Sequence, residues 1–429
     1  MSRTDIAGLT ARRIWDSRGR PTVEADVLLA CGAVGRGVAP AGASRGSREA
    51  IELRDGGTAL GGLGVDRALG AIRDEIAPAL AGLDAADQGR IDEILVALDG
   101  TPHKSRLGGN ALIAVSLGVL QAAAAANGSP LWRHLAGDRP VRLPLPEIQI
   151  FGGGAHAARR IDIQDLMVIP VGAADFTEAL VMVAEVYRAA GAIMAERGKL
   201  HGVADEGGWW PEFAINEEAL EALLQAIERA GFHPGDEVAI SLDIAASEFG
   251  SNGSYRLGLE RRELDTEQMI DLLGGWLGRF PIAAIEDPLA EDDTEGMRRF
   301  TARFGHQVQV IGDDYLVTNA GLIEAAAVAG ACNAALIKPN QAGTVSETLA
   351  ALAAARREGM ATIISARSGE TEDTTLAHLA VGWDCGQLKV GSFARSERMA
   401  KWNEVLRITE QAGAQATFAG RSVLWARSC

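Results

Sequence analysis

Short apolar runs, each closed by one charged residue, recur through the second half of the chain. One of the six runs, at 361–364, stops at Ser365-Ala366-Arg367-Ser368, which places a guanidinium and a hydroxyl just beyond its end. Aliphatic runs of this length predict buried strands with the charges at their carboxyl ends. The other five runs and their charges are 238–242 with Asp243, 282–285 with Glu286, 308–312 with Asp313, 334–337 with Lys338 and 387–388 with Lys389.

The spacing of these charged strand ends predicts the fold of this region. From Glu286 onward they follow one another at 22 to 29 residues, whereas Asp243 and Glu286 lie 43 residues apart. The shorter distances fit strand–helix repeats in a parallel sheet, and functional charges at carboxyl strand ends are typical of an α/β barrel. Amphipathic patterns predict long helices at 176–197 and 216–230, with Asn216 as the N-cap of the second.

The first 136 residues have a mixed pattern. Residues 22–29 alternate like a strand, and helices are predicted at about 65–97 and 110–126. Small residues dominate the loop at 39–47, which is either a surface connection or a lid over a site. A proline-rich passage from residue 137 suits a domain boundary, so we expect one domain at 1–136 and a second at 137–429.

Composition narrows the class of protein. The chain has 429 residues, of which 47% are hydrophobic and 23% charged, as in soluble globular proteins. A net charge of -16 without a basic tail argues against nucleic acid as a partner. Four scattered cysteines and an N-terminus without a signal-like apolar core fit the cytoplasm. The longest apolar run, 111–126, is shorter than the about 20 residues that span a bilayer, so no membrane partner is expected.

The charged strand ends predict a metal site and a base. Carboxylates a few Å apart repel one another by about 4 kcal/mol per pair at an intermediate dielectric, so Asp243, Glu286 and Asp313 need a cation. Their all-oxygen chemistry favours magnesium. An N-cap or a surface position is the commoner fate of a single such acid, but three at successive strand ends favour the metal. Lys338 and Lys389 are both expected near that cation and Arg367, where a lysine has a lowered pKa and can act as a general base.

Longer phrases of this sequence resemble the enolase (phosphopyruvate hydratase) family over nearly the whole chain. Short glycine-flanked acids such as Glu206 are weak signals alone, whereas these phrases are long and specific. They begin at Asp16 (DSRGRPTVE), Leu107 (LGGNA), Asp205 (DEGG), Leu242 (LDIAASEF), Ile285 (IEDPLAEDD), Gly312 (GDD), Ile337 (IK), Arg367 (RSGETEDT) and Ala394 (ARSER).

The resemblance implies a smaller α+β domain before a modified eight-stranded α/β (TIM-like) barrel, in a homodimer or higher homo-oligomer. It implies one or two Mg²⁺ ions and the elimination of water from a 2-phosphoglycerate-type substrate, a small phosphorylated carboxylate. Enzymes of this superfamily use a lysine or histidine base beside Mg²⁺. By position, Lys338 is the implied base, Lys389 holds the substrate carboxylate and Glu206 protonates the leaving hydroxyl.

The same resemblance implies the remaining ligands. Ser44 in the small-residue loop is the implied ligand of a second magnesium ion, beside the three acids of the first. Arg367 and Ser368 bind phosphate, His156 and Gln164 line the site, and Asp165 belongs to the acid cluster beside the leaving hydroxyl.

Four departures from the family pattern bear on the substrate. Losing one acid–base partner typically costs about 10²- to 10⁴-fold in rate, so an alanine in place of a histidine before the phosphate-binding arginine is a large change. The extra arginines predict a larger or more anionic partner, with Arg45 as a substrate contact. The departures are Ala366 for histidine, Asp165 for glutamate, Arg45 in the loop at 41–46, and Gly152 for asparagine with Arg159 and Arg160 nearby.

Three functions therefore stay open at this point. The first is an ordinary phosphopyruvate hydratase. The second is a specialised relative such as a carboxyphosphonoenolpyruvate synthase of phosphonate biosynthesis, which combines phosphoglycerate with an activated phosphonate. The third is a non-catalytic enolase-like scaffold or binding protein, against which the retained Lys338, Lys389, Glu206 and metal acids argue.

Overall fold

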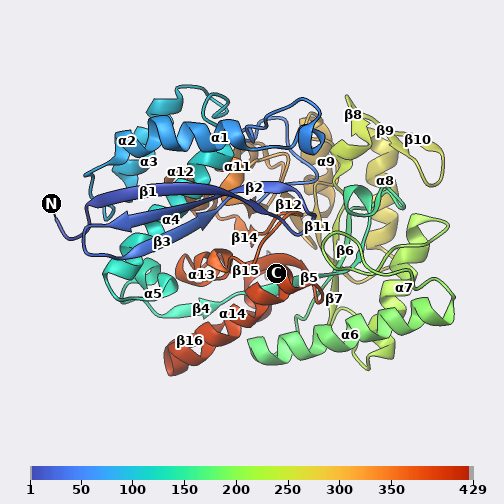
Figure 1. Cartoon of the computed structure of the whole chain (residues 1–429). Helices are drawn as coiled ribbons and strands as arrows, with labels where there is room; N and C mark the ends of the chain where they lie inside the picture. Colours follow the sequence, from blue (N-terminus) through green and yellow to red (C-terminus); the bar gives the residue numbers. More distant parts are fainter. Residues whose placement is uncertain (1, 425–429) are drawn as a thin grey trace.

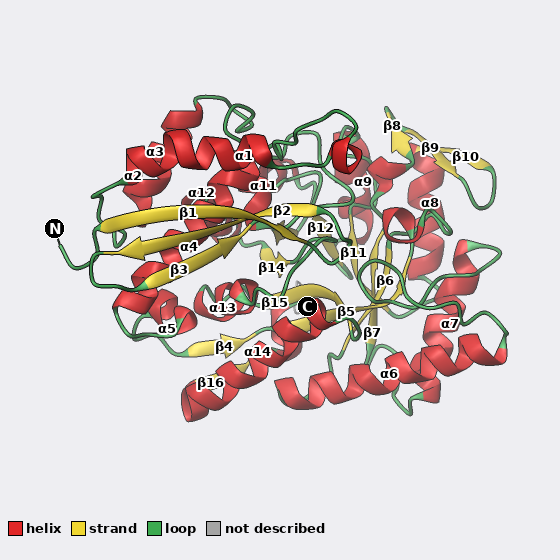
Figure 2. Ribbon diagram, in the orientation of Figure 1, coloured by secondary structure: helices red, strands yellow, loops and turns green. Residues whose placement is uncertain are grey.

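The computed structural model describes residues 2–424, which form a small α+β part and a closed eight-stranded barrel (Figure 1). The N-terminal sheet, blue in Figure 1, lies to one side of the barrel strands, and the helices drawn red in Figure 2 lie around those strands. This arrangement confirms the predicted fold class.

The α+β part is built on an antiparallel sheet in the order β1-β2-β3, with β1 (Ile6–Trp15), β2 (Pro21–Leu29) and β3 (Val34–Val38). Its central strand confirms the strand predicted at 22–29. Four helical segments pack on this sheet, namely α1 (Asp66–Ala71), the π-helix η2 (Ile72–Ile76), α2 (Ala77–Leu80) and α4 (Gly109–Ala126). Two further helices, α3 (Gln88–Asp99) and α5 (Leu131–Ala136), pack on α4.

Helix α4 is the core of this part. Its length and hydropathy would suit a membrane span, but 89% of it is buried within the structure, where it packs on β2 and β3. Gly37 permits this approach, since a Cβ there would lie 2.0 Å from the carbonyl oxygen of Ala114. The prediction of a buried helix at 110–126 is therefore confirmed.

The barrel closes in the order β11-β12-β13-β14-β15-β5-β6-β7. All neighbouring pairs are parallel except those of β6, which runs antiparallel to both β5 and β7. Residues 153–164, between β5 and β6, contain no helix long enough for a parallel crossover. The strands are β5 (Leu145–Gly152), β6 (Asp165–Ile169), β7 (Ala239–Asp243), β11 (Ile282–Glu286), β12 (Gln309–Gly312), β13 (Ala334–Ile337), β14 (Ala361–Ser365) and β15 (Gln387–Ser392).

The predicted strand–helix repeats are confirmed from β11 onward. The longer interval before Glu286 contains a small sheet of β8 (Gly250–Ser251), β9 (Ser254–Leu257) and β10 (Arg262–Asp265). The barrel helices are α6 (Phe176–Glu196), α7 (Asn216–Arg229), α8 (Thr266–Leu277), α9 (Thr294–Phe304), α10 (Ala320–Ala329), α11 (Pro339–Ala342), α12 (Val345–Arg357), α13 (Thr375–Gly382) and α14 (Ser396–Ala412).

Short elements complete the described chain. A separate two-stranded parallel sheet consists of β4 (Val141–Leu143) and β16 (Ala416–Phe418). The 3₁₀ helices are η1 (Ala59–Gly62), η3 (Gly154–Ala157), η4 (Ala246–Glu248), η5 (Gly413–Gln415) and η6 (Gly420–Val423).

The N-cap predicted for α7 is wrong. Ile215, with extended backbone, is the N-cap residue, and Asn216 is the first residue inside the helix. The Asn216 side chain is buried and bonded to Asp162, donating from Nδ2 to Oδ2 at 2.8 Å and accepting from the Asp162 backbone N–H at 3.0 Å. The Asn216 side chain thus bonds to Asp162, which is distant in the sequence, instead of capping its own helix as the local pattern predicts.

Candidate active site

Three buried carboxylates meet two buried lysines at the carboxyl end of the barrel strands. Asp243 ends β7, Glu286 ends β11 and Asp313 follows β12. Lys389 of β15 donates from Nζ to Asp243 Oδ2 at 3.0 Å and to Glu286 Oε2 at 2.7 Å. Lys338, which follows β13, donates to Asp313 Oδ2. Asp243 and Glu286 thus share the Lys389 ammonium, while Asp313 pairs with Lys338, so each predicted metal acid has an ammonium partner.

The predicted lowering of the Lys338 pKa is wrong for this arrangement. Burial is the largest single influence on Lys338 and lowers its pKa, but Asp313 and Glu286 together offset burial, and the pKa is raised. At Lys389, burial again lowers the pKa, and the surrounding carboxylates, chiefly Asp243 and Glu286, together hold it well above the ordinary value. The cationic neighbours considered from the sequence matter less than the carboxylate that faces each amine.

The acids fit a divalent cation. Burial, then repulsion from Asp243, raises the pKa of Glu286 well above its ordinary value, and its Oε1 is buried without a hydrogen-bond partner. A cation bound by carboxylate oxygens would relieve both costs. Asp287 lies within 4.8 Å of Asp313, but its carboxylate accepts the backbone N–H groups of residues 313 and 314 and so positions the loop.

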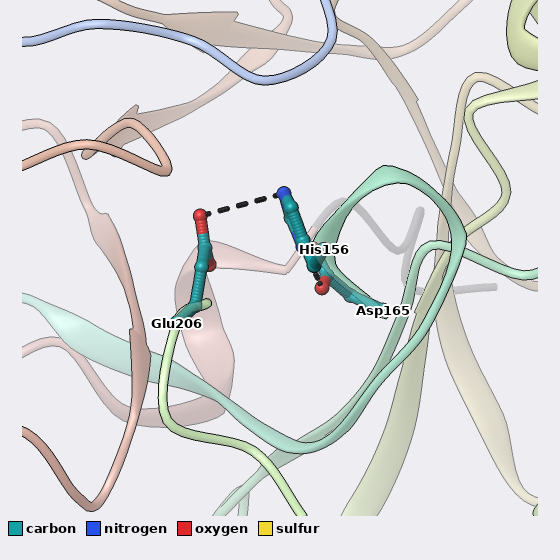
Figure 3. A group of neighbouring side chains, drawn as sticks. All are labelled: His156, Asp165 and Glu206. Atoms are coloured by element: carbon teal, nitrogen blue, oxygen red, sulfur yellow. Dashed lines mark hydrogen bonds and ion pairs between the residues drawn. The ribbon is translucent and has the colours of Figure 1, made fainter. Parts of the chain in front are cut away.

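A second cluster joins His156, Asp165 and Glu206 (Figure 3). The Nδ1 atom of His156 lies 2.9 Å from Asp165 Oδ1, and its Nε2 lies 3.7 Å from Glu206 Oε1 and 3.1 Å from Ser368 Oγ. Asp165 also accepts a hydrogen bond from Gln149 and lies 3.5 Å from Lys389 Nζ. The imidazole thus connects the predicted acid cluster to a predicted phosphate contact.

His156 makes stability depend on pH. Burial alone would lower its pKa, but the charges of Asp165 and Glu206 raise it to about 9. Because the pKa of the folded state exceeds that of the unfolded state, the stabilisation is complete below about pH 6.5 and is lost as pH rises through about 9. We expect about 3 kcal/mol of unfolding free energy to be lost across that window. Urea unfolding at several pH values checks this, and a His156→Gln variant should show a flatter profile.

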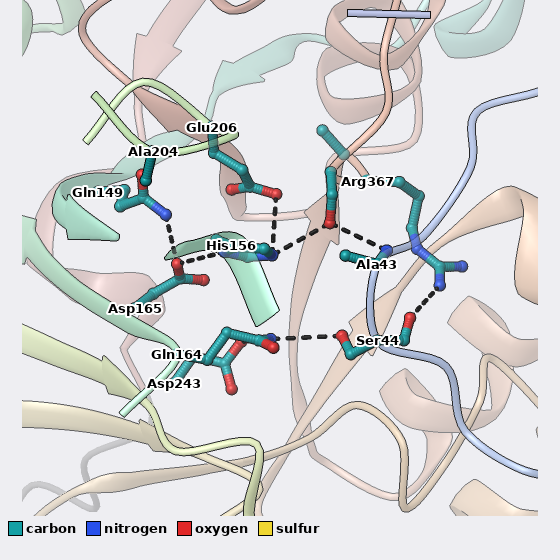
Figure 4. A network of polar contacts seen from close by, with 12 residues as sticks. Ala43, Ser44, Gln149, His156, Gln164, Asp165, Ala204, Glu206, Asp243 and Arg367 are labelled. Atoms are coloured by element: carbon teal, nitrogen blue, oxygen red, sulfur yellow. Dashed lines mark hydrogen bonds and ion pairs between the residues drawn. The ribbon is translucent and has the colours of Figure 1, made fainter. Parts of the chain in front are cut away.

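The loop at residues 41–49, called here the lid segment, contacts the predicted phosphate site (Figure 4). The Ala43 backbone N–H donates to Ser368 Oγ at 3.1 Å, and the Ser44 carbonyl oxygen accepts from Arg367 Nη2 at 3.0 Å. Gln164 Nε2 donates to Asp243 Oδ2 at 3.1 Å and to Ser44 Oγ at 3.4 Å. The segment thus lies over the site, as the lid interpretation of this loop expects.

Side chains from both clusters and from the lid segment line one small cavity of about 20 Å³, which has room for about one water molecule. Ala366 lies in its wall. Arg45 is exposed and is not part of the lining, while Arg159 lies 2.8 Å from Glu248 and Arg160 lies 3.7 Å from Glu212. The lining comprises Ser44, His156, Gln164, Asp165, Glu206, Asp243, Lys338, Ser365, Ala366, Arg367, Ser368, Lys389 and Val390.

Four polar residues of the site have no counterpart among the sequence predictions, and one of them, Asn340, accepts a hydrogen bond from Arg367. Glu49 pairs with Arg367, Gln149 holds Asp165, and Gln341 donates to Asp313 Oδ1 at 2.9 Å. Glu49 and Gln341 lie outside the apolar runs, and Gln149 lies within a buried strand whose polar residues obscure its pattern. Only the short distance of Glu49 from the small-residue loop could have drawn attention to it.

Comparison with known protein families matches both parts of the chain. Residues 6–135 match the family described as Enolase, N-terminal domain, and residues 140–427 match Enolase, C-terminal TIM barrel domain. These matches agree with the small α+β part and the closed barrel. The chain therefore belongs to the enolase family.

Proposed function

We propose that the protein is a Mg²⁺-dependent lyase that eliminates water from a 2-phosphoglycerate-type substrate to give a phosphoenolpyruvate-type product. The observation that carries this proposal is the placement of Lys338, Lys389 and Glu206 around one cavity. Such an elimination needs three groups from the protein: a base, a cationic side chain that binds the substrate carboxylate, and an acid. We assign these roles to Lys338, Lys389 and Glu206, in that order.

The two lysines serve the carboxylate end of the substrate. Lys338 removes the proton from the carbon next to the carboxylate, and Lys389 donates hydrogen bonds to the carboxylate as negative charge accumulates there. Mg²⁺ held by Asp243, Glu286 and Asp313, with Ser44 toward a second ion, would supply further positive charge there. It would also compete with Lys338 for Asp313, the carboxylate that most raises the Lys338 pKa, and would so favour the neutral amine that a base requires.

The histidine cluster serves the leaving hydroxyl. Glu206 delivers a proton to the hydroxyl as its bond to carbon breaks. His156, held by Asp165 at Nδ1, keeps its other nitrogen toward Glu206 and Ser368 and so orients both. Arg367 and Ser368 bind the phosphoryl group, whose charge matches the guanidinium.

The lining position of Ala366 favours a second candidate function. A methyl group stands there in the cavity wall, where an imidazole would fill more space and could transfer a proton. That extra room suits the specialised alternative, in which phosphoglycerate reacts together with an activated phosphonate. Arg159 and Arg160, which also suggested this alternative, lie near acidic residues outside the cavity lining and add less support.

One assay tests the proposal and separates the two candidates. We expect the purified protein with Mg²⁺ to convert 2-phosphoglycerate, followed by the absorbance of the enol product, and we expect excess EDTA to stop the reaction. Parallel reactions contain an activated phosphonate. Turnover at ordinary enzyme rates on 2-phosphoglycerate alone would contradict the specialised function, whereas turnover only with the phosphonate would establish it. Absence of turnover in every reaction would contradict both.

A further inference from the structure

All four terminal N–H groups of Arg367 are engaged by other residues of the chain. Nη1 donates to Glu49 Oε2 at 3.0 Å and to Asn340 Oδ1 at 3.1 Å. Nη2 donates to the Ser44 carbonyl oxygen at 3.0 Å and to Glu49 Oε1 at 3.2 Å. Glu49 therefore forms the two-bond pair with the guanidinium that a phosphoryl group would otherwise form.

The Glu49–Arg367 pair is buried and strong. Both side chains are almost fully shielded from solvent, at 5% and 3% exposure. Burial lowers the pKa of Arg367, but the surrounding carboxylates, Glu49 foremost among them, together offset burial, and the pKa is raised. A second anion cannot share this face of the guanidinium without repelling Glu49, and the repulsion is large because water is excluded.

The lid segment supplies most of these contacts. Ser44 and Glu49 provide three of the four acceptors around Arg367, and Ala43 holds Ser368 from the same segment. One displacement of this segment would therefore release both predicted phosphate ligands together.

We propose that Glu49 is an internal competitor at the phosphate position, which a substrate must displace to reach Arg367. A phosphoryl dianion carries more charge than a carboxylate and can make the same two-bond pair, so it replaces Glu49 where a monoanion does not. Glu49 is then a positioning residue that restricts the substrate class to phosphoryl or phosphonyl compounds. This inference rests on the proposed function, because it takes Arg367 as the phosphate ligand.

Gln341 links this exchange to the acid cluster. Its Nε2 donates to Glu49 Oε1 at 3.2 Å and to Asp313 Oδ1 at 2.9 Å, while its Oε1 accepts from Thr318 at 2.6 Å. When Glu49 leaves, the amide loses one of its two acceptors and keeps the other, Asp313, which pairs with Lys338. One side chain thus connects the phosphate position to that carboxylate.

The test measures the binding of inorganic phosphate by isothermal titration calorimetry in EDTA, so that turnover plays no part. Removing the competing charge in Glu49→Gln should lower the Kd for phosphate about tenfold, because the binding-competent state becomes more populated. Glu49→Asp, whose shorter carboxylate reaches Arg367 less well, should lower it by a smaller factor. A merely structural role would raise the Kd in both variants.

Two matched variants make the outcome decisive. Glu291 accepts the Ser47 backbone N–H at 3.1 Å, so Glu291→Gln loosens the lid segment without touching Arg367. Because the competing Glu49 carboxylate remains, this variant should lower the Kd much less than Glu49→Gln does, and an equal lowering in both would overturn the competitor role. Arg367→Met should abolish phosphate binding. If it does not, the assignment of Arg367 in the proposed function fails. If Arg367→Met abolishes binding but neither folded Glu49 variant tightens it, the competitor role of Glu49 is overturned and the proposed function stands.

Discussion

Replacing Lys338 with methionine is expected to lower the turnover of 2-phosphoglycerate by at least about 10²- to 10⁴-fold, the usual contribution of a positioned acid–base group. Lys338 is the buried amine that follows β13 and lines the cavity beside Ser368 and Lys389. Methionine keeps a similar length and apolar stem but cannot accept a proton. The loss should therefore appear in kcat more than in KM.

The exchange of the substrate α-proton with deuterated solvent isolates the role of Lys338. Exchange should be lost together with turnover in Lys338→Met, whereas a variant that blocks only the loss of hydroxyl, such as Glu206→Gln, should retain it. Lys199→Met provides a matched control, because that lysine lies outside the cavity, 3.5 Å from Glu218. Full activity in Lys338→Met would show that another group is the base.

The strand ends of the barrel were predictable because each strand is short, aliphatic and closed by a charge. The same pattern did not predict β5 and β6. β5 contains Glu147 and Gln149, both fully buried, so it does not read as an apolar run. The reversed direction of β6 follows from the short connection before it, and hydrophobic pattern carries no information on strand direction.

The identity of most site residues was also predictable, but their electrostatics were not. The sign of the Lys338 pKa shift depends on which carboxylate faces the amine, and that pairing joins residues 25 positions apart. Glu49 was missed because a charge in an irregular loop has no periodic signature, and its partner Arg367 lies 318 positions away. The pairing of distant charges requires the fold.

Replacing Lys389 with methionine is expected to lower the free energy of unfolding by about 3–5 kcal/mol, the usual effect of removing one partner from a buried ion pair. The Lys389 ammonium lies within 3.0 Å of Asp243 and Glu286, and Asp165 is 3.5 Å away. Without the Lys389 ammonium, these three buried carboxylates lose the cation that they share and repel one another. Urea unfolding at pH 7.5 in EDTA measures the change.

Magnesium should recover much of the stability lost in Lys389→Met, because a cation bound by Asp243 and Glu286 replaces the missing charge. Lys401→Met is the matched control. Lys401 is equally buried, but its carboxylate partner is Glu370, at 3.1 Å, outside the barrel-mouth acids. Lys401→Met should therefore also have a lower free energy of unfolding, but magnesium should stabilise it no more than it stabilises the wild type. A Lys389→Met protein as stable as wild type in EDTA would contradict the pairing, and equal magnesium responses in both variants would contradict the metal assignment of these acids.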